Sequence, residues 1–185
     1  MRKLLQYGGI AASIVLIAFG IGAIFTGFNG RSQVRTDLAA EQIVGTDDST
    51  IPGQLVDTGS EAQAFAAIMR HHTLEATAGK TYSQMGQYLD AKGNPTDDKA
   101  LAAVDPQTKK PVANQARQIW VTETALTTAL NTAFFAERVA TFAIVMGFAL
   151  LLSGIGFAVL TLAALIPAGA RKRERSATAA AVPVA

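Results

Sequence analysis

The fold is decided by residues 139–166, which read VATFAIVMGFALLLSGIGFAVLTLAALI. They belong to a run of 32 residues, from Val139 to Ala170, that contains no Asp, Glu, Lys or Arg. At about 1.5 Å of rise per residue, a helix of this length exceeds the roughly 30 Å hydrocarbon core of a bilayer. Pro167 and Gly169 mark its end. The sequence therefore predicts a transmembrane helix over residues 139–166.

A second apolar run lies near the amino terminus. Leu4 to Gly30 are 27 residues without a charged side chain, and residues 4–28 are predicted to form the first transmembrane helix. The alternative is a cleavable signal peptide, whose apolar region is usually about 7–15 residues long and ends in an A-x-A-like site. This run is longer, and Thr26-Gly-Phe28 offers no such site. An uncleaved signal anchor is therefore expected.

The charged residues indicate the orientation of the chain. Residues 1–3 and 171–185 hold six Lys/Arg and one acid, whereas residues 29–138 hold ten Lys/Arg and thirteen Asp/Glu, a net charge of −3. Because loops rich in Lys and Arg stay in the cytoplasm, residues 1–3 and the tail 167–185 are predicted to be cytoplasmic. The chain is expected in the plasma membrane as a multi-pass protein, with residues 29–138 extracytoplasmic. The opposite orientation is the alternative.

This distribution of charge also bears on the partners. A basic excess in a soluble protein suggests nucleic acid, but here it lies at the membrane flanks and is a topology signal, so no nucleic-acid partner is expected. The basic tail, 167–185, is expected to be disordered and to contact anionic lipid. The predicted spans contain no ionisable residue, which argues against a proton relay or an ion pathway.

Small residues recur along both predicted spans. Helix packing in membranes favours small side chains because they let two backbones approach closely. The two spans are therefore predicted to pack on each other, and packing on a partner chain is the alternative. The candidate packing residues are Gly8, Ala18 and Gly22 in the first span and Gly147 and Gly154 in the second.

The segment between the spans shows mainly helix signals. The first helix is predicted to continue through residues 31–44 until Gly45 stops it, and a loop is expected over 46–59. Ser60-Glu-Ala-Gln63 matches a capping box, and Thr81-Tyr-Ser-Gln84 repeats the pattern. The intervening helix should bury His72 and end at Gly79. Residues 91–111 are polar, with one helical turn expected around 99–103.

From Asn114 onward nothing breaks a helix until the second span has ended. Ile119, Leu126 and Ala133 recur every seven residues and predict an apolar stripe, whose antiparallel neighbour would be the extension of the first helix. The predicted fold is thus an all-α membrane protein. Its two transmembrane helices extend into an extracytoplasmic helical hairpin or bundle.

Three stretches together resemble a family of two-span actinobacterial membrane proteins, over most of the chain. They are Leu38–Thr46, then His72–Thr77 with Lys80–Gly86, and finally Ala116–Leu126. The resemblance implies the two-span topology and an actinobacterial origin. It implies no activity, substrate or cofactor.

Candidate metal ligands are confined to one short segment. His71 and Glu75 lie four residues apart on a helix face, and His72 with Glu75 is an alternative pair. A stable site needs three or four ligands, so Asp90, Asp97 or Asp98 would have to complete it. We expect instead that these side chains are structural, with no metal and no cofactor. No nucleophile elbow or phosphate loop is present, and the chain is predicted not to be an enzyme.

The large amphipathic aromatic residues outside the spans are Tyr82, Tyr88 and Trp120. They are candidates for an interaction surface, although a packed helical domain would bury the same residues. The sequence favours a non-enzymatic accessory or scaffold subunit that binds another protein or an envelope component through its outer domain. The alternatives are a small-ligand or signal-sensing membrane module and, more remotely, a metal-dependent enzyme using His71, His72 and Glu75.

Overall fold

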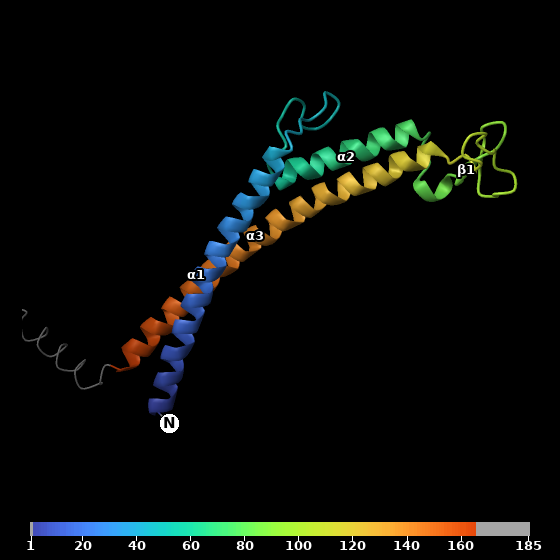
Figure 1. The fold of residues 1–185 in the computed structure, drawn as a ribbon. Helices are drawn as coiled ribbons and strands as arrows, with labels where there is room; N and C mark the ends of the chain where they lie inside the picture. Colours follow the sequence, from blue (N-terminus) through green and yellow to red (C-terminus); the bar gives the residue numbers. More distant parts are fainter. Residues whose placement is uncertain (1, 166–185) are drawn as a thin grey trace, which may run out of the picture. The chain divides into compact units, whose positions relative to one another are not determined.

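The computed structural model describes residues 2–165 and contains three α-helices within that range (Figure 1). They are α1 (Arg2–Ala40), α2 (Gly59–Ala76) and α3 (Gln115–Leu165). The chain divides into two compact units, which we call the apolar unit (residues 1–29 and 139–185) and the polar unit (residues 30–138). The tail predicted to be basic and disordered, residues 167–185, lies outside the described residues.

The apolar unit pairs the first part of α1 with the last part of α3. Both helices are long and apolar enough to cross a membrane. Only 11% and 17% of their most apolar segments is buried, whereas a core helix of a soluble protein would be mostly buried. Large apolar side chains such as Phe19, Phe142 and Leu160 are therefore exposed over half or more of their surface. Such a surface is stable only beside an apolar solvent or partner.

Glycines bring the two helices of the apolar unit together. A Cβ atom built on Gly20 would lie 2.7 Å from the backbone N of Leu151 and 2.8 Å from the carbonyl O of Gly147. A Cβ on Gly27 would lie 2.7 Å from the carbonyl O of Ala140. We call Gly20, Gly27, Gly147 and Gly154 the glycine contact. Since backbone atoms cannot move aside as side chains do, these positions exclude any side chain in this packing.

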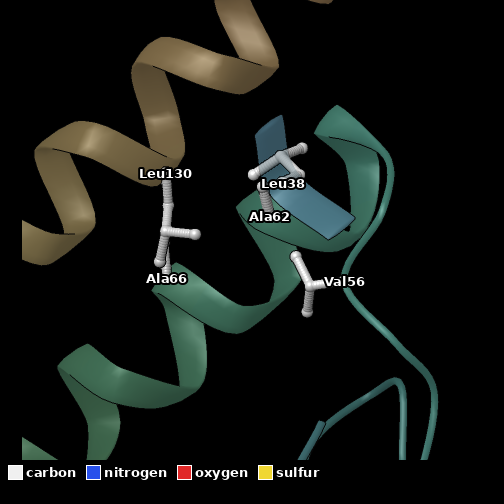
Figure 2. Packing of buried hydrophobic residues seen from close by; sticks show 5 residues of the cluster. All are labelled: Leu38, Val56, Ala62, Ala66 and Leu130. Carbon is white, nitrogen blue, oxygen red and sulfur yellow. The ribbon is translucent and has the colours of Figure 1, made fainter. Parts of the chain in front are cut away.

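The core of the polar unit is small and draws on all three helices. Leu38 of α1, Ala62 and Ala66 of α2 and Leu130 of α3 pack around Val56, which is completely buried (Figure 2). Val56 belongs to the loop between α1 and α2, so this loop contributes to the core and does not merely connect two helices.

Helix α1 ends five residues before the glycine that was expected to stop it. The amides of Glu41 and Gln42 bond to carbonyls three residues back, at 3.1 and 3.2 Å, and Gln42 takes a positive φ of 53°. The loop then folds on itself through an antiparallel bridge between Val44 and Leu55. This early end lets the loop reach back and place Val56 in the core.

Helix α2 begins at a capping box that differs from the predicted one. Thr58 accepts a hydrogen bond from the Glu61 amide at 3.3 Å, and the Glu61 carboxylate accepts one from the Thr58 amide at 2.9 Å. The predicted box used Ser60 and Gln63. Glu61 has the advantage of a negative charge beside the positive end of the helix dipole.

Helix α2 lies along α3 in the polar unit, where an extension of α1 was expected (Figure 1). The first residue of α2, Gly59, contacts Glu137, and Thr77 just beyond its end contacts Trp120, so the two helices are antiparallel. In the polar unit α3 therefore has α2 as its antiparallel neighbour, and the end of α1 packs against both through residues such as Leu38.

The segment between α2 and α3 contains short strands where a helix was expected. A single 3-10 turn, η1 (Tyr82–Gln84), precedes β1 (Tyr88–Leu89) and β2 (Pro95–Thr96), which pair antiparallel with Tyr88 opposite Thr96. A Cβ on Gly86 would lie 2.5 Å from the Thr96 amide N, so this approach requires glycine. The helical turn expected around 99–103 is replaced by bridges, including one between Asp90 and Ala102.

Candidate functional site

A carboxylate of α3 joins the three helices of the polar unit. Oε1 of Glu137 lies 2.9 Å from Nε of Arg31 and 2.9 Å from Nε of Arg35, and Oε2 accepts a 2.6 Å hydrogen bond from the Gly59 amide. The Gly59 amide is the first of α2, one of the donors that a helix leaves without an internal partner. Glu137 thus pairs with two cations and caps α2 with one side chain.

The environment of Glu137 favours its ionised form. Burial alone would raise the pKa of Glu137, but the hydrogen bonds from Arg31, the Gly59 amide and Arg35 outweigh burial and hold its pKa below the ordinary value. The close approach also explains the glycine, because a Cβ on residue 59 would lie 2.8 Å from Cα of Phe134. The arrangement is a structural ion cluster.

The two histidines take different partners. Nε2 of His72 lies 2.6 Å from Oδ2 of Asp48, and Nε2 of His71 lies 3.4 Å from Oε1 of Glu75. The hydrogen bond from His72 is the largest cause that lowers the pKa of Asp48 to about 2. His72 was expected on the buried stripe of α2. Its side chain is 42% exposed because it turns outward to tie the loop between α1 and α2 to α2.

These contacts do not assemble a metal site. Within residues 2–165, no three His, Cys, Asp or Glu side chains are grouped in a way that could hold a metal ion. The carboxylates that were candidates for further ligands accept backbone hydrogen bonds instead. Asp90 and Asp98 accept from amides within their own turns, and Asp97 accepts from the amide of Gln87, ten residues earlier. The pair His71 and Glu75 remains on an exposed helix face.

The three candidate aromatic residues lie at different depths. Trp120 is 3% exposed, and its indole N–H donates to the carbonyl O of Lys80 at 2.9 Å. The guanidinium of Arg70 covers the ring of Trp120, with Cζ 5.2 Å from its centroid. Tyr88 is half-buried in β1, and Tyr82 is 45% exposed. Trp120 therefore anchors the segment after α2 onto α3, and Tyr82 remains accessible.

Tyr82 lines a shallow hollow at the start of α3. The hollow has a volume of about 200 Å³ and is also lined by Gln87, Arg117, Gln118 and Val121. Cζ of Arg117 lies 4.0 Å from the centroid of the Tyr82 ring, and its buried Nε has no hydrogen-bond partner within residues 2–165. Val121 is 47% exposed. We call Tyr82, Arg117 and Val121 the distal hollow.

The candidate packing residues are divided between two faces. Gly147 and Gly154 belong to the glycine contact, facing Ile24 and Ile17 of α1. A Cβ on Gly8 or Gly22 would meet no atom within 4 Å, and Ala18 is exposed. The glycines of α1 that meet α3 are instead Gly9, which faces Thr161, and Gly20 and Gly27, which lie seven residues apart. Counting in steps of seven residues from Gly20 leads to Gly27 and would have identified the face of α1 that packs on α3.

Sequence reasoning also missed the Glu137 cluster. Arg31 and Arg35 were considered only as topology signals, and Glu137 was not considered as a partner for them. Their spacing of four residues places both guanidinium groups on one side of α1, which was the available signal. The acid that they meet could not be predicted, because Glu137 lies 106 residues after Arg31 and 102 residues after Arg35 in the chain.

Comparison with known proteins does not add to this description. No protein-family model, curated protein or solved structure matches the chain.

Proposed function

We propose that the chain is a non-enzymatic integral membrane protein whose extracytoplasmic polar unit binds another protein or an envelope component through the distal hollow. It would act as an accessory or scaffold subunit of the plasma membrane. The observation that carries this proposal is the stacking of the half-buried Arg117 against the exposed ring of Tyr82, beside the exposed Val121. Aromatic residues and Arg contribute most to protein interfaces because they combine large apolar area with directed hydrogen bonds.

The setting of the distal hollow favours binding. Asn114 donates from its side-chain amide to the carbonyl O of Gly86 at 3.0 Å and accepts from the amide of Ala116, so it fixes the start of α3 against the segment that carries Tyr82. Trp120 fixes the same segment from the other end through Lys80. A surface held by such contacts loses little conformational entropy on binding.

The apolar unit supports the membrane part of the proposal. Lipid would cover its exposed apolar side chains. Because the polar unit is joined to an apolar helix at both of its ends in the sequence, both helices would hold it at the membrane. The basic residues Arg2 and Lys3 at the start of α1, together with those after residue 170, favour cytoplasmic termini and an extracytoplasmic polar unit.

The proposal is tested by crosslinking in cells and then purification in mild detergent. A partner should be recovered with the wild-type chain and lost from a Tyr82→Ala, Val121→Ser variant. The matched control is Tyr7→Ala, Val145→Ser, which changes the same residue types in the apolar unit, where both are exposed. Recovery of the chain alone after crosslinking, or equal recovery of the partner by both variants, would refute the proposal.

A further inference from the structure

A second hollow in the polar unit lies between its three helices and is larger than the distal one. It has a volume of about 790 Å³, within the range of roughly 300–1,000 Å³ that is usual for small-molecule sites. Each helix contributes apolar side chains to its wall: Val34 and Leu38 from α1, Phe65 and Met69 from α2, and Leu126 and Ala133 from α3. We call it the three-helix groove. Leu38 and Leu130, two of the core residues drawn in Figure 2, also line it.

The polar side chains of the groove carry one sign of charge. Two carboxylates line it: Asp37 from the last turn of α1 and Glu41 from the turn that follows α1. Asp37 accepts a 2.8 Å hydrogen bond from the Gln33 side chain, and no charged partner of Glu41 is present among residues 2–165. Thr132 is the remaining polar lining residue.

Positive charge is absent from the lining of this groove. Within the described part of the chain, no Lys, Arg or His belongs to its wall. The nearest cations in the α1 sequence, Arg31 and Arg35, are bound to Glu137. An anionic ligand would therefore meet two carboxylates and no counter-charge, whereas a cation would meet two.

We propose that the three-helix groove binds an amphiphilic cation, a molecule with an alkyl or similarly apolar body and an amine or quaternary ammonium group. The apolar body lies against Phe65, Met69 and Leu126, which would otherwise present apolar surface to water. The cationic group lies at Asp37 and Glu41. This site is separate from the distal hollow, so the inference does not depend on the proposed function.

The groove is tested with two photoreactive probes that share one alkyl chain, a diazirine derivative of dodecylamine and the corresponding dodecanol. The full-length chain in maltoside micelles is irradiated with each probe, and the labelled residues are identified by mass spectrometry. The amine probe should label residues of the groove, Leu126 or Met69 among them, more strongly than the alcohol.

Two variants separate the contributions of charge and space. Asp37→Asn with Glu41→Gln should lower amine labelling of the groove about tenfold and leave alcohol labelling unchanged. The control Asp47→Asn removes a carboxylate outside the groove. Ala129→Trp, which fills the groove, should lower labelling by both probes, whereas Asn131→Trp, on the same helix but outside the lining, should not.

Three outcomes would overturn the inference. Equal labelling by amine and alcohol in every charge variant would show an apolar site without preference for a cation. Labelling confined to the apolar unit would show that the probes only partition beside its helices. Crosslinks that join Leu126 of two copies of the chain would show that the groove is occupied by a second copy. Far-ultraviolet circular dichroism, which does not depend on the number of tryptophans, verifies that each variant is folded.

Discussion

Glu137 accepts hydrogen bonds from Arg31 and Arg35 of α1 and from the Gly59 amide of α2. Glu137→Gln keeps an acceptor but removes the charge that neutralises the two guanidinium groups. Losing one partner of a fully buried ion pair costs about 3–5 kcal/mol. The two arginine side chains are 41% and 43% exposed, so water screens them and the expected loss of unfolding free energy is about 1–3 kcal/mol.

This loss is measured by urea unfolding of the full chain in detergent, monitored by the fluorescence of Trp120, which lies in the polar unit. Glu41→Gln is the matched control, since it makes the same substitution at an exposed carboxylate outside the cluster. Equal unfolding midpoints for the two variants would show that the Glu137 cluster contributes nothing to stability.

The same carboxylate predicts how stability depends on pH. The pKa of Glu137 is lower in the folded protein than its ordinary value of 4.5. Its contribution to stability is therefore fully present above about pH 4.5 and is lost as the pH falls through the folded pKa. The pKa values of Asp48, Glu61, Asp90 and Asp105 are lowered too, so the whole polar unit should lose stability in acid.

Unfolding midpoints measured from neutral pH to about pH 3 test this prediction. Wild-type stability should fall more steeply below pH 4.5 than that of Glu137→Gln, which has already lost the contribution of this group. Parallel curves for the two proteins would contradict the assignment of acid sensitivity to Glu137.

At the scale of elements, α1 and α3 of the apolar unit meet through glycine on both sides. Gly20→Leu would force a side chain to within 3 Å of the backbone of Leu151 and Gly147. Overpacking of this kind costs about 1–3 kcal/mol. Gly22→Leu is the control, because a Cβ on Gly22 meets no atom within 4 Å. The two variants have the same composition and differ only in the face of α1.

The measurement is the amount of SDS needed to unfold each variant in mixed maltoside micelles, monitored by circular dichroism. Gly20→Leu should unfold at lower SDS than the wild type, and Gly22→Leu should unfold with the wild type. If Gly22→Leu is the more sensitive variant, the face predicted from Gly8, Ala18 and Gly22 is the one that packs.

The elements also show where local sequence signals were sufficient. Thr81-Tyr-Ser-Gln84 forms its capping interaction, since the Gln84 side chain accepts from the Thr81 amide at 2.8 Å. Residues 88–89 form a strand because Tyr88 pairs with Thr96 and makes a further bridge with Ala113, partners that no local signal specifies. The predicted capping box, Ser60–Gln63, and the observed one, Thr58–Glu61, share two residues. The charge of Glu61 is the local feature that favours the second.

At the scale of the whole molecule, the proposed topology predicts which segments are accessible from outside the cell. The chain has no cysteine, so a single cysteine can report the location of any position. Asp47→Cys should react with a membrane-impermeant maleimide on intact cells, because it lies in the polar unit and is exposed. Ala180→Cys should react only after the cells are permeabilised. The reverse pattern would establish the opposite orientation.

The sequence predicted the features that depend on neighbouring residues of the chain better than those that depend on contacts between distant residues. Two helices that are long and apolar enough to cross a membrane could be predicted directly from uncharged runs of 27 and 32 residues. The sequence named Tyr82, Tyr88 and Trp120 as surface candidates, but it did not distinguish the exposed Tyr82 from the buried Trp120, because burial depends on contacts with other elements. Glu137 and the three-helix groove were not predicted, since each depends on residues of three helices meeting in space.

The glycine contact has a consequence for the order of events during synthesis. Gly9 faces Thr161, so the two sides of this packing are made at nearly opposite ends of the chain. About 150 residues separate them, which at typical rates of synthesis take roughly 8–30 s to produce. During that interval the glycine face of α1 has no α3 to pack against, so under the proposed topology lipid or the insertion machinery would cover it. The proposed first span would therefore depend on other molecules to cover its glycine face until α3 is made and packs against it.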